Sequence, residues 1–286
     1  MMISLVKEQK FGETKHLHVF KTRDTETNQN LVVKTREDFS EARKEARILS
    51  KLDHPNIIEL VNFIELNKSC WLVRNYYWKD LQSYIHKMPY QPQLIRSYAF
   101  KILCGLSHCN SNGVLHRNIN PSNILLHEKG SIRIIGFGSS TFVSEAEENV
   151  DYTTDIHYKA PEVLLGAQQC SFASDIWSAG VVIAEMFKGG VLFNEYSEMN
   201  QIKMIFRTLG TPTEEDWSGV TSFPKYPSNF PVFPKAGIKE IEDPNARDLV
   251  MRMLTYDPSK RIAVSEALYH PYFKDLQQKV VEKCRV

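Results

Sequence analysis

The sequence lacks the features that mark several classes of protein. It has no run of 18 apolar residues, so we expect no segment that spans a bilayer. Its 35 Lys and Arg residues nearly balance its 34 Asp and Glu residues, which gives no electrostatic reason to expect nucleic acid or an anionic membrane as a partner. The five cysteines form no CxxC pair and are odd in number. The opening residues, MMISLVKEQKFGE, are too short and too charged for a signal peptide. We therefore expect a reduced, intracellular protein of the cytoplasm or nucleus.

The first quarter of the chain predicts a small sheet with one helix. Residues 17–20, 31–34 and 71–73 are short apolar or β-branched runs typical of strands, and 22–30 is a polar hairpin connection. Asp38, with Glu41 three residues on, resembles a capping box at the start of a helix. The apolar face of this helix repeats every three or four residues and contains Phe39, Ala42, Ala46, Leu49 and Leu52.

The rest of the chain predicts a mainly helical structure. Leu94, Tyr98, Ile102 and Leu106 share one helical face, which ends at Asn112-Gly113. Residues 174–190 are apolar nearly all round, as expected of a helix buried in a larger domain. Residues 211–235 hold five prolines and predict an irregular loop.

Four spaced motifs carry a family resemblance. They are HRNINPSN (116–123), GFG (136–138), APE (160–162) and DIWSAG (175–180). In this order they resemble the HRDLKPxN, DFG, APE and DxWSxG motifs of the eukaryotic protein kinases. The resemblance implies an α+β, bilobal kinase fold, with a β-rich N-lobe that holds one regulatory helix and a larger helical C-lobe.

Other segments narrow the resemblance and divide the chain. Four of them look like the cyclin-dependent-kinase-like (CMGC) group: LDHPNII (52–58), APEVLLG (160–166), FRTLGTP (206–212) and YDPSKRI (256–262). The resemblance implies a single kinase-like domain over 1–286. It divides the domain into an N-lobe at about 1–74, a hinge at about 75–80, a C-lobe at about 81–274 and a short tail at 275–286.

The catalytic positions depart from the family pattern. Asn118 stands where the family has its catalytic Asp, and its neutral amide cannot act as a general base. Asn120 stands where the family has a Lys, and Gly136 stands where it has the metal-binding Asp of DFG. Asn123 matches the second metal ligand of the family, but one neutral amide is a poor site for Mg²⁺. We therefore expect no intact catalytic residue and no metal site.

The nucleotide-binding positions are also degenerate. Only Gly12 remains of the glycine-rich loop, and Val32 and Ile135 are bulkier than the residues usual in the family. Arg74 replaces the apolar gatekeeper, where its charge needs an anionic partner or solvent. No cofactor is expected to be required, and weak, metal-independent ATP binding stays open. The vestigial pocket implied by the resemblance consists of Gly12, Val19, Lys34, Glu45, Asn123 and Leu125.

Architectural pairs of the family are retained. Glu45 shares a helical face with apolar residues, so its carboxylate calls for a cation, and Lys34 is the partner in the family. The alternative is a solvated Glu at the edge of the apolar stripe. Asp175 matches the residue that caps the HRD loop, and Glu162 and Arg261 match a buried pair of the C-lobe.

The regulatory features are altered as well. The phosphate-binding pocket of the active group is reduced to Arg117, with Lys44 and Thr141 at its other two positions. The acidic residues of 144–151 either dock against Arg117 and Lys44 in place of a phosphate or form a solvated loop. Tyr152, Thr153 and Thr154 are candidate phosphosites. The cyclin-binding segment is shorter than the group norm, which leaves cyclin binding uncertain.

These departures lead to one main functional hypothesis and one rival. The main hypothesis is a pseudokinase that serves as a non-catalytic scaffold or allosteric regulator of intracellular signalling. Its partner would be a protein, namely an active kinase, a cyclin-like protein or an adaptor, and not nucleic acid or a membrane. The alternative is a weak or atypical Ser/Thr protein kinase that transfers the γ-phosphate of ATP to protein hydroxyls.

Overall fold

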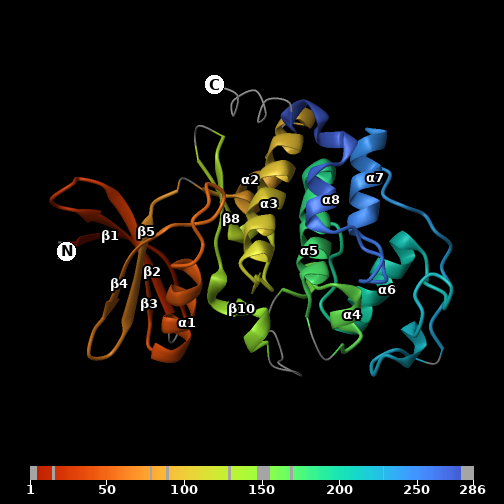
Figure 1. Cartoon of the computed structure of the whole chain (residues 1–286), viewed down its shortest axis with the longest axis horizontal. Helices are drawn as coiled ribbons and strands as arrows, with labels where there is room; N and C mark the ends of the chain where they lie inside the picture. Colours follow the sequence, from red (N-terminus) through yellow and green to blue (C-terminus); the bar gives the residue numbers. More distant parts are fainter. Residues whose placement is uncertain are drawn as a thin grey trace.

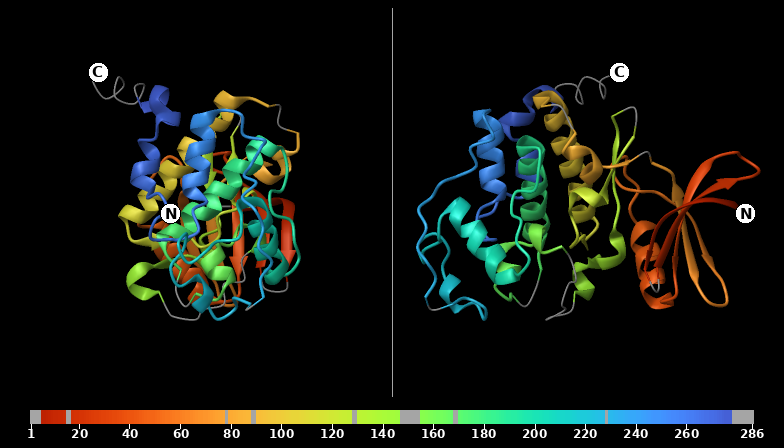
Figure 2. Two further views of the ribbon diagram at one scale, coloured as in Figure 1. Left: turned by 90° about the vertical axis from the view of Figure 1, so that its right-hand side faces the viewer. Right: turned by 180° about the vertical axis from the view of Figure 1, so that it is seen from behind.

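The chain folds into two parts of different structure. The computed structural model describes residues 5–14, 17–77, 79–87, 90–127, 130–146, 155–167, 170–227 and 229–277. A β-sheet with helix α1 lies at one end of the molecule, and the long helices lie at the other (Figure 1). The view from behind shows the same division (Figure 2, right). This confirms the α+β, two-lobed fold class expected from the sequence.

The N-terminal sheet has five antiparallel strands in the order β1-β2-β3-β5-β4. The three strands predicted from the sequence lie within β2, β3 and β5. Phe20, Leu31, Val33 and Val73 form a small buried cluster on this sheet. The strand bounds are Leu5–Thr14 for β1, Leu17–Asp24 for β2, Asn30–Arg36 for β3, Leu60–Glu65 for β4 and Cys70–Asn75 for β5.

Helix α1 (Phe39–Leu49) begins where the capping signal predicts. The side chain of Asp38 accepts a hydrogen bond from the backbone N–H of Glu41 at 3.0 Å. The reciprocal half of the predicted capping box is not formed by Glu41, whose carboxylate pairs with Arg36. Asp38 therefore satisfies a free N–H at the helix start, and Glu41 is used to tie the helix to β3.

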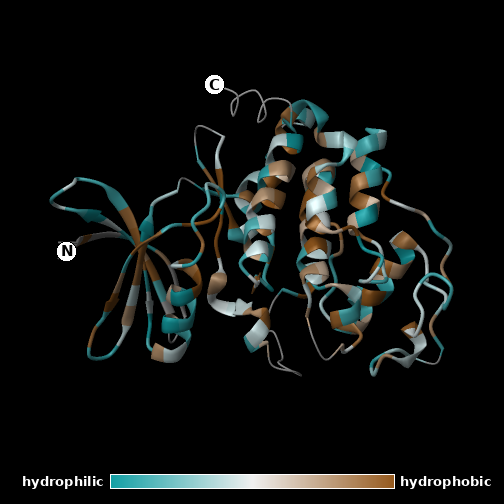
Figure 3. Cartoon of the chain, in the orientation of Figure 1, coloured by the Kyte–Doolittle hydropathy of each residue, from teal (hydrophilic) through white to brown (hydrophobic). Residues whose placement is uncertain are grey.

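The C-terminal part is built around helix α5 (Phe172–Lys188). Its residue Trp177 is fully buried, and most of the helix carries the hydrophobic colour in Figure 3. Gly189 ends the helix at φ +71°. The other helices are α2 Leu81–Ile85, α3 Pro92–Ser111, α4 Pro161–Leu164, α6 Glu198–Leu209, α7 Pro244–Met253 and α8 Val264–Leu268.

Short strands connect the two parts. β6, β8 and β9 form a three-stranded sheet, and β7 pairs with β10. A parallel bridge joins Ile57, in the segment after α1, to Ile134 of β9. Gly105 of α3 packs at this point, where a Cβ atom would lie 3.2 Å from the carbonyl oxygen of Asn56. The bounds are Lys79–Asp80 for β6, Val114–Leu115 for β7, Ile124–Leu126 for β8, Ile132–Ile134 for β9 and Thr141–Phe142 for β10.

The proline-rich segment 211–235 is irregular, as predicted. Among its described residues, the only helical turn is a 3₁₀ turn at Val220–Ser222. It packs through Trp217, which is 3% exposed and stacks on Tyr256.

The helices were also compared with the requirements for crossing a membrane. In the part of the chain that the structure describes, no helix combines the length and the apolar character needed to cross a bilayer.

Candidate functional site

A buried ion pair joins β3 to α1. Nζ of Lys34 lies 2.7 and 2.6 Å from the two carboxylate oxygens of Glu45, and Glu45 is only 5% exposed. Nε of Arg36 lies 3.8 Å from the same carboxylate. The structure thus places Lys34 and Glu45 in contact, as the resemblance implies. Glu45 points inward, as the helical pattern predicts, and is not a solvated residue at the edge of the stripe. Arg36 is an additional cation that the sequence analysis did not include, although alternation along a strand places residues 34 and 36 on one face.

The pair borders a cavity of about 210 Å³. Apolar side chains, among them Leu49, Leu72 and Ile135, form much of its wall. Its polar lining includes Lys34, Glu45, Arg74 and Asn123, which come from β3, α1, β5 and the loop before β8. The cavity is therefore mostly apolar, with several charged groups at one side.

The other residues of the predicted pocket lie in different places. Val19 lines the cavity, whereas Leu125 is not among its lining residues. Gly12 pairs with Val19 across β1 and β2, and its surroundings are not described. Of the two residues expected to narrow the pocket, Ile135 lines the cavity and Val32 is buried outside its lining.

Asp175 anchors the loop that begins at His116 and leads to Asn118 and Asn120. Its carboxylate accepts hydrogen bonds from the backbone N–H groups of His116 and Arg117, both at 2.8 Å. Burial raises the pKa of Asp175 to about 6, although the two N–H groups oppose this shift. Arg117 has φ +65°, an uncommon conformation for a residue other than glycine. The anchor that the sequence predicts for Asp175 is present.

His116 connects this loop to the segment before Gly136. Its Nε2 lies 3.0 Å from the carbonyl oxygen of Ile135, and its ring contacts Phe137 edge-on at a centroid distance of 4.6 Å. Burial lowers the pKa of His116 to about 4. We therefore assign it a neutral, structural role that fixes the two segments side by side.

The side chains of Asn118, Asn120 and Asn123 take part in a network of neutral hydrogen bonds. The side-chain amide of Asn120 donates to Oδ1 of Asn118 at 2.8 Å. The side-chain amide of Asn123 donates to the carbonyl oxygen of Asn118 at 2.8 Å, and its backbone N–H donates to Oδ1 of Asn120. Their polar groups therefore bond mainly to one another and supply neither a base nor a cation.

Asn123 also occupies the space beside Gly136. A Cβ atom built on Gly136, whose φ is +90°, would lie 2.5–2.6 Å from the side-chain amide of Asn123. No carboxylate projects from Gly136, and the described residues contain no cluster of three or more His, Cys, Asp or Glu side chains that would hold a metal ion. A neutral amide alone does not meet the demand of Mg²⁺ for anionic oxygen ligands. The residues present do not fit a magnesium site.

Arg74 lies at the cavity without a partner among the described residues. Its Nε is shielded from solvent and has no hydrogen-bond partner. Burial lowers the pKa of Arg74, while the charge of Glu45 raises it. Within the described part of the chain no carboxylate is hydrogen-bonded to Arg74, and the residue is partly exposed, so of the two expected alternatives solvent reaches part of the side chain.

A comparison with protein families agrees with this architecture. The chain matches the protein kinase domain over residues 5–273. This chain belongs to the protein kinase family. The match spans the sheet, the cavity and the helical part, so the motif positions named above are positions of a kinase domain.

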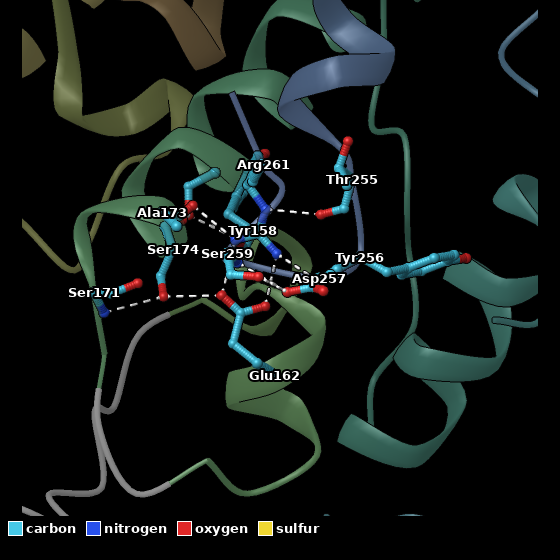
Figure 4. A network of polar contacts seen from close by, with 11 residues as sticks. Tyr158, Glu162, Ser171, Ala173, Ser174, Thr255, Tyr256, Asp257, Ser259 and Arg261 are labelled. Carbon is cyan, nitrogen blue, oxygen red and sulfur yellow. Dashed lines mark hydrogen bonds and ion pairs between the residues drawn. The ribbon is translucent and has the colours of Figure 1, made fainter. Parts of the chain in front are cut away.

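The C-lobe of this kinase domain contains the buried pair that the motifs predict. Nη1 and Nη2 of Arg261 each lie 2.8 Å from one carboxylate oxygen of Glu162 (Figure 4). Ser174 donates to the same carboxylate at 3.1 Å, and Arg261 also donates to the carbonyl oxygen of Ala173 at 2.7 Å. This satisfied network ties α4 to the loop before α8.

The segment after the GFG motif contacts helix α1 through a different arginine from the one expected. Glu145 forms an ion pair with Arg47. The guanidinium of Arg47 also lies over the ring of Phe142, 5.1 Å from its centroid. The partner of Glu145 is therefore Arg47, and docking of the other acidic residues against Arg117 and Lys44 stays a prediction.

Other expected groups of this kinase segment lie outside the described residues. They are Glu147, Glu148, Asp151, Tyr152, Thr153 and Thr154. Thr141, which the resemblance aligns with the third position of the phosphate pocket, is 1% exposed and pairs with Leu115 in the short β7–β10 sheet. Thr141 thus has a packing role.

Proposed function

We propose that this member of the protein kinase family is a pseudokinase of the cyclin-dependent-kinase-like type. It acts as a non-catalytic scaffold or allosteric regulator in signalling inside the cell. The observation that carries the proposal is the neutral amide network of Asn118, Asn120 and Asn123 beside Gly136.

The chemistry of phosphoryl transfer supports this proposal. Catalysis in this family is positioning plus electrostatic stabilisation around a metal-bound nucleotide. Asn118 cannot accept the proton of a substrate hydroxyl, Asn120 cannot neutralise the transferring phosphate, and Gly136 cannot bind a metal ion. The loss of a general base alone costs about 10²–10⁴-fold in rate, and here all three functions are absent together.

The retained interactions support a binding role. The Lys34–Glu45 pair, the Asp175 anchor and the Glu162–Arg261 pair fix the lobes and the loops between them. None of these contacts needs a nucleotide. A fixed kinase surface can scaffold a complex, compete with an active relative or activate it. The proposed partner is accordingly a protein, namely an active kinase, a cyclin-like protein or an adaptor.

One observation favours the alternative of a weak Ser/Thr protein kinase. The Lys34–Glu45 pair is fully formed at 2.6–2.7 Å, which is the arrangement that phosphate binding requires in active kinases. Under this alternative ATP must bind together with a metal ion, because Lys34 alone does not neutralise the phosphate charge.

Thermal unfolding with ATP distinguishes the two functions. We expect no stabilisation by ATP that depends on Mg²⁺, and the same melting temperature with Mg²⁺ or EDTA at equal ATP concentration. A Lys34→Met variant serves as the control, because it alters the cavity that Lys34 lines. Stabilisation that requires Mg²⁺ and is lost in Lys34→Met would contradict the proposal and favour the alternative.

Affinity purification from cells, followed by mass spectrometry, identifies the protein partner. The pseudokinase proposal predicts a stable protein complex whose assembly is unchanged in an Asn118→Ala variant. A complex that forms only with intact Asn118 and added ATP would instead indicate an enzyme bound to its substrate.

A further inference from the structure

Arg74 is an unusual feature of the cavity. It belongs to the central part of the sheet, where its backbone pairs with Val32 and Leu60. Its side chain lines the cavity, and its Nε is fully shielded from water. No hydrogen bond or ion pair joins this side chain to another described residue. Arg74 is partly exposed as a residue, but an Nε–H that is removed from water without a partner is costly and calls for an oxygen acceptor.

The protein does not itself provide a free anion at this place. Glu45 is the buried carboxylate of the cavity, and both of its oxygens are bonded to Lys34. Arg36 lies close to the same carboxylate. Glu59 also borders the cavity, but it is an exposed residue whose charge water screens. One buried carboxylate thus faces three cations, namely Lys34, Arg36 and Arg74.

Lys34 has a hydrogen-bond donor to spare. Its ammonium group has three N–H bonds, and Glu45 accepts two. Burial is the main cause that lowers the pKa of Lys34; Glu45 opposes the shift, while Arg36 and Arg74 add to it. Lys34 and Arg74 are therefore near enough to repel each other, and an anion between them would relieve that repulsion.

The size and walls of the cavity limit the ligand. A volume of about 210 Å³ exceeds the cavity of about 150 Å³ that holds a benzene molecule, but is below the range of about 300–1,000 Å³ for drug-sized ligands. Leu49, Leu72 and Ile135 supply apolar wall. The space suits a compact molecule that has one acidic group and an apolar body.

We propose that this cavity binds a compact organic anion, a phosphate monoester or carboxylate on an apolar body, whose acidic group contacts Arg74 and Lys34 without a metal ion. The site differs from a magnesium–nucleotide site because Arg74 of β5 adds its positive charge to that of Lys34 of β3, in place of a metal ion. The inference does not rest on the proposed function, since ligand binding here requires no statement about catalysis.

The test is calorimetric titration of the full chain in EDTA with phenyl phosphate and, separately, benzoate. Benzyl alcohol serves as the neutral probe of the same shape. We expect at least one acid to bind more tightly than benzyl alcohol. The Arg74→Leu variant should weaken binding of that acid by about ten- to a hundredfold, because it removes a charge-assisted hydrogen bond. Its binding of benzyl alcohol should change little.

Matched variants exclude general effects of charge. Arg74→Lys keeps a cation and should weaken acid binding less than Arg74→Leu. Arg252→Leu removes an exposed arginine of α7, outside the cavity lining, and should leave acid binding unchanged.

Wild-type protein alone also decides the question if a variant fails to fold. The acids must raise its melting temperature in EDTA more than benzyl alcohol does. Failure of both acids to bind, or equal acid affinity in wild type and Arg74→Leu, would overturn the proposal.

Discussion

The side-chain amide of Asn120 donates a hydrogen bond to Oδ1 of Asn118 over 2.8 Å. The motif resemblance aligns these two residues with an Asp and a Lys of the active family, and under that alignment two neutral amides replace a pair of opposite charges. Asn123 completes the network through the backbone carbonyl of Asn118. The three asparagines therefore form a bonded structure in their own right.

The packing of Asn123 against Gly136 predicts a large cost for adding a side chain at Gly136. Gly136→Ala should destabilise the fold through left-handed strain of about 1–2 kcal/mol and overpacking of about 1–3 kcal/mol. Gly113→Ala is the matched control, because Gly113 has φ +67° and nothing lies within 4 Å of its built Cβ. Urea unfolding of the two variants measures the difference.

A second background identifies the cause of that difference. In an Asn123→Ala protein, the amide that meets the new Cβ is gone. In this background, the loss of unfolding free energy caused by Gly136→Ala should fall to the loss caused by Gly113→Ala. Equal costs for Gly136→Ala and Gly113→Ala in the wild-type background would show that Asn123 does not fill the site.

The buried pair of the C-lobe predicts a strong contrast with a surface pair. Arg261→Met leaves the buried carboxylate of Glu162 without its cation, and should cost about 3–5 kcal/mol of unfolding free energy. Arg252→Met breaks an exposed pair with Asp248 and should cost less than about 1 kcal/mol. Denaturant unfolding of both variants checks this contrast, and similar losses would contradict it.

Glu185 predicts a pH dependence of stability. Burial raises the pKa of Glu185 to about 7, while hydrogen bonds from Leu192 and Tyr158 oppose the shift. The folded state therefore holds the proton more tightly than the unfolded state, and the contribution of Glu185 to stability falls as the pH rises from about 4.5 to 7. The change is on the order of 3 kcal/mol.

The Glu185→Gln variant isolates this contribution. The raised pKa of Asp175 and the lowered pKa of His116 act in opposite directions, and both are common to the two proteins. Wild type should therefore lose stability relative to Glu185→Gln as the pH rises through this window. A stability difference that stays constant from pH 4.5 to 7 would show that Glu185 ionises normally.

The Arg47–Glu145 pair predicts local control of the segment after the GFG motif. Arg47→Ala should speed hydrogen exchange of residues 141–146 by severalfold, since it removes the ion pair and the contact with Phe142. Arg43→Ala removes another exposed arginine of α1, which pairs with Glu65 of β4, and should leave this segment unchanged. Identical exchange in both variants would contradict a role for Arg47.

Sequence reasoning predicted the features that depend on local periodicity. The apolar repeat of α1 predicted that Glu45 points inward, and the motif position of Lys34 predicted that Lys34 is its partner. The helix cap at Asp38 and the C-terminal end of α3 followed from capping and glycine signals. These features depend on residues close in sequence or on the resemblance, so one sequence sufficed.

Contacts set by loop conformation were not predictable in the same way. Arg47 was not expected as the partner of Glu145, because the path of residues 141–146 decides which arginine of α1 they meet. The position of Asn123 beside Gly136 depends on the left-handed turn at Gly136 and on the amide network. Arg36 is a different case, because strand alternation from Lys34 gave a usable signal.

The central claim is that the amide network at Asn118, Asn120 and Asn123 does not support phosphotransfer. The most direct measurement uses ATP labelled on its γ-phosphate, with Mg²⁺ and a protein substrate. Wild type is compared with an Asn118→Ala variant purified in the same way. We predict equal label incorporation in the two proteins, at the level of a blank without protein. Magnesium-dependent transfer by wild type that is lost in Asn118→Ala would contradict the account.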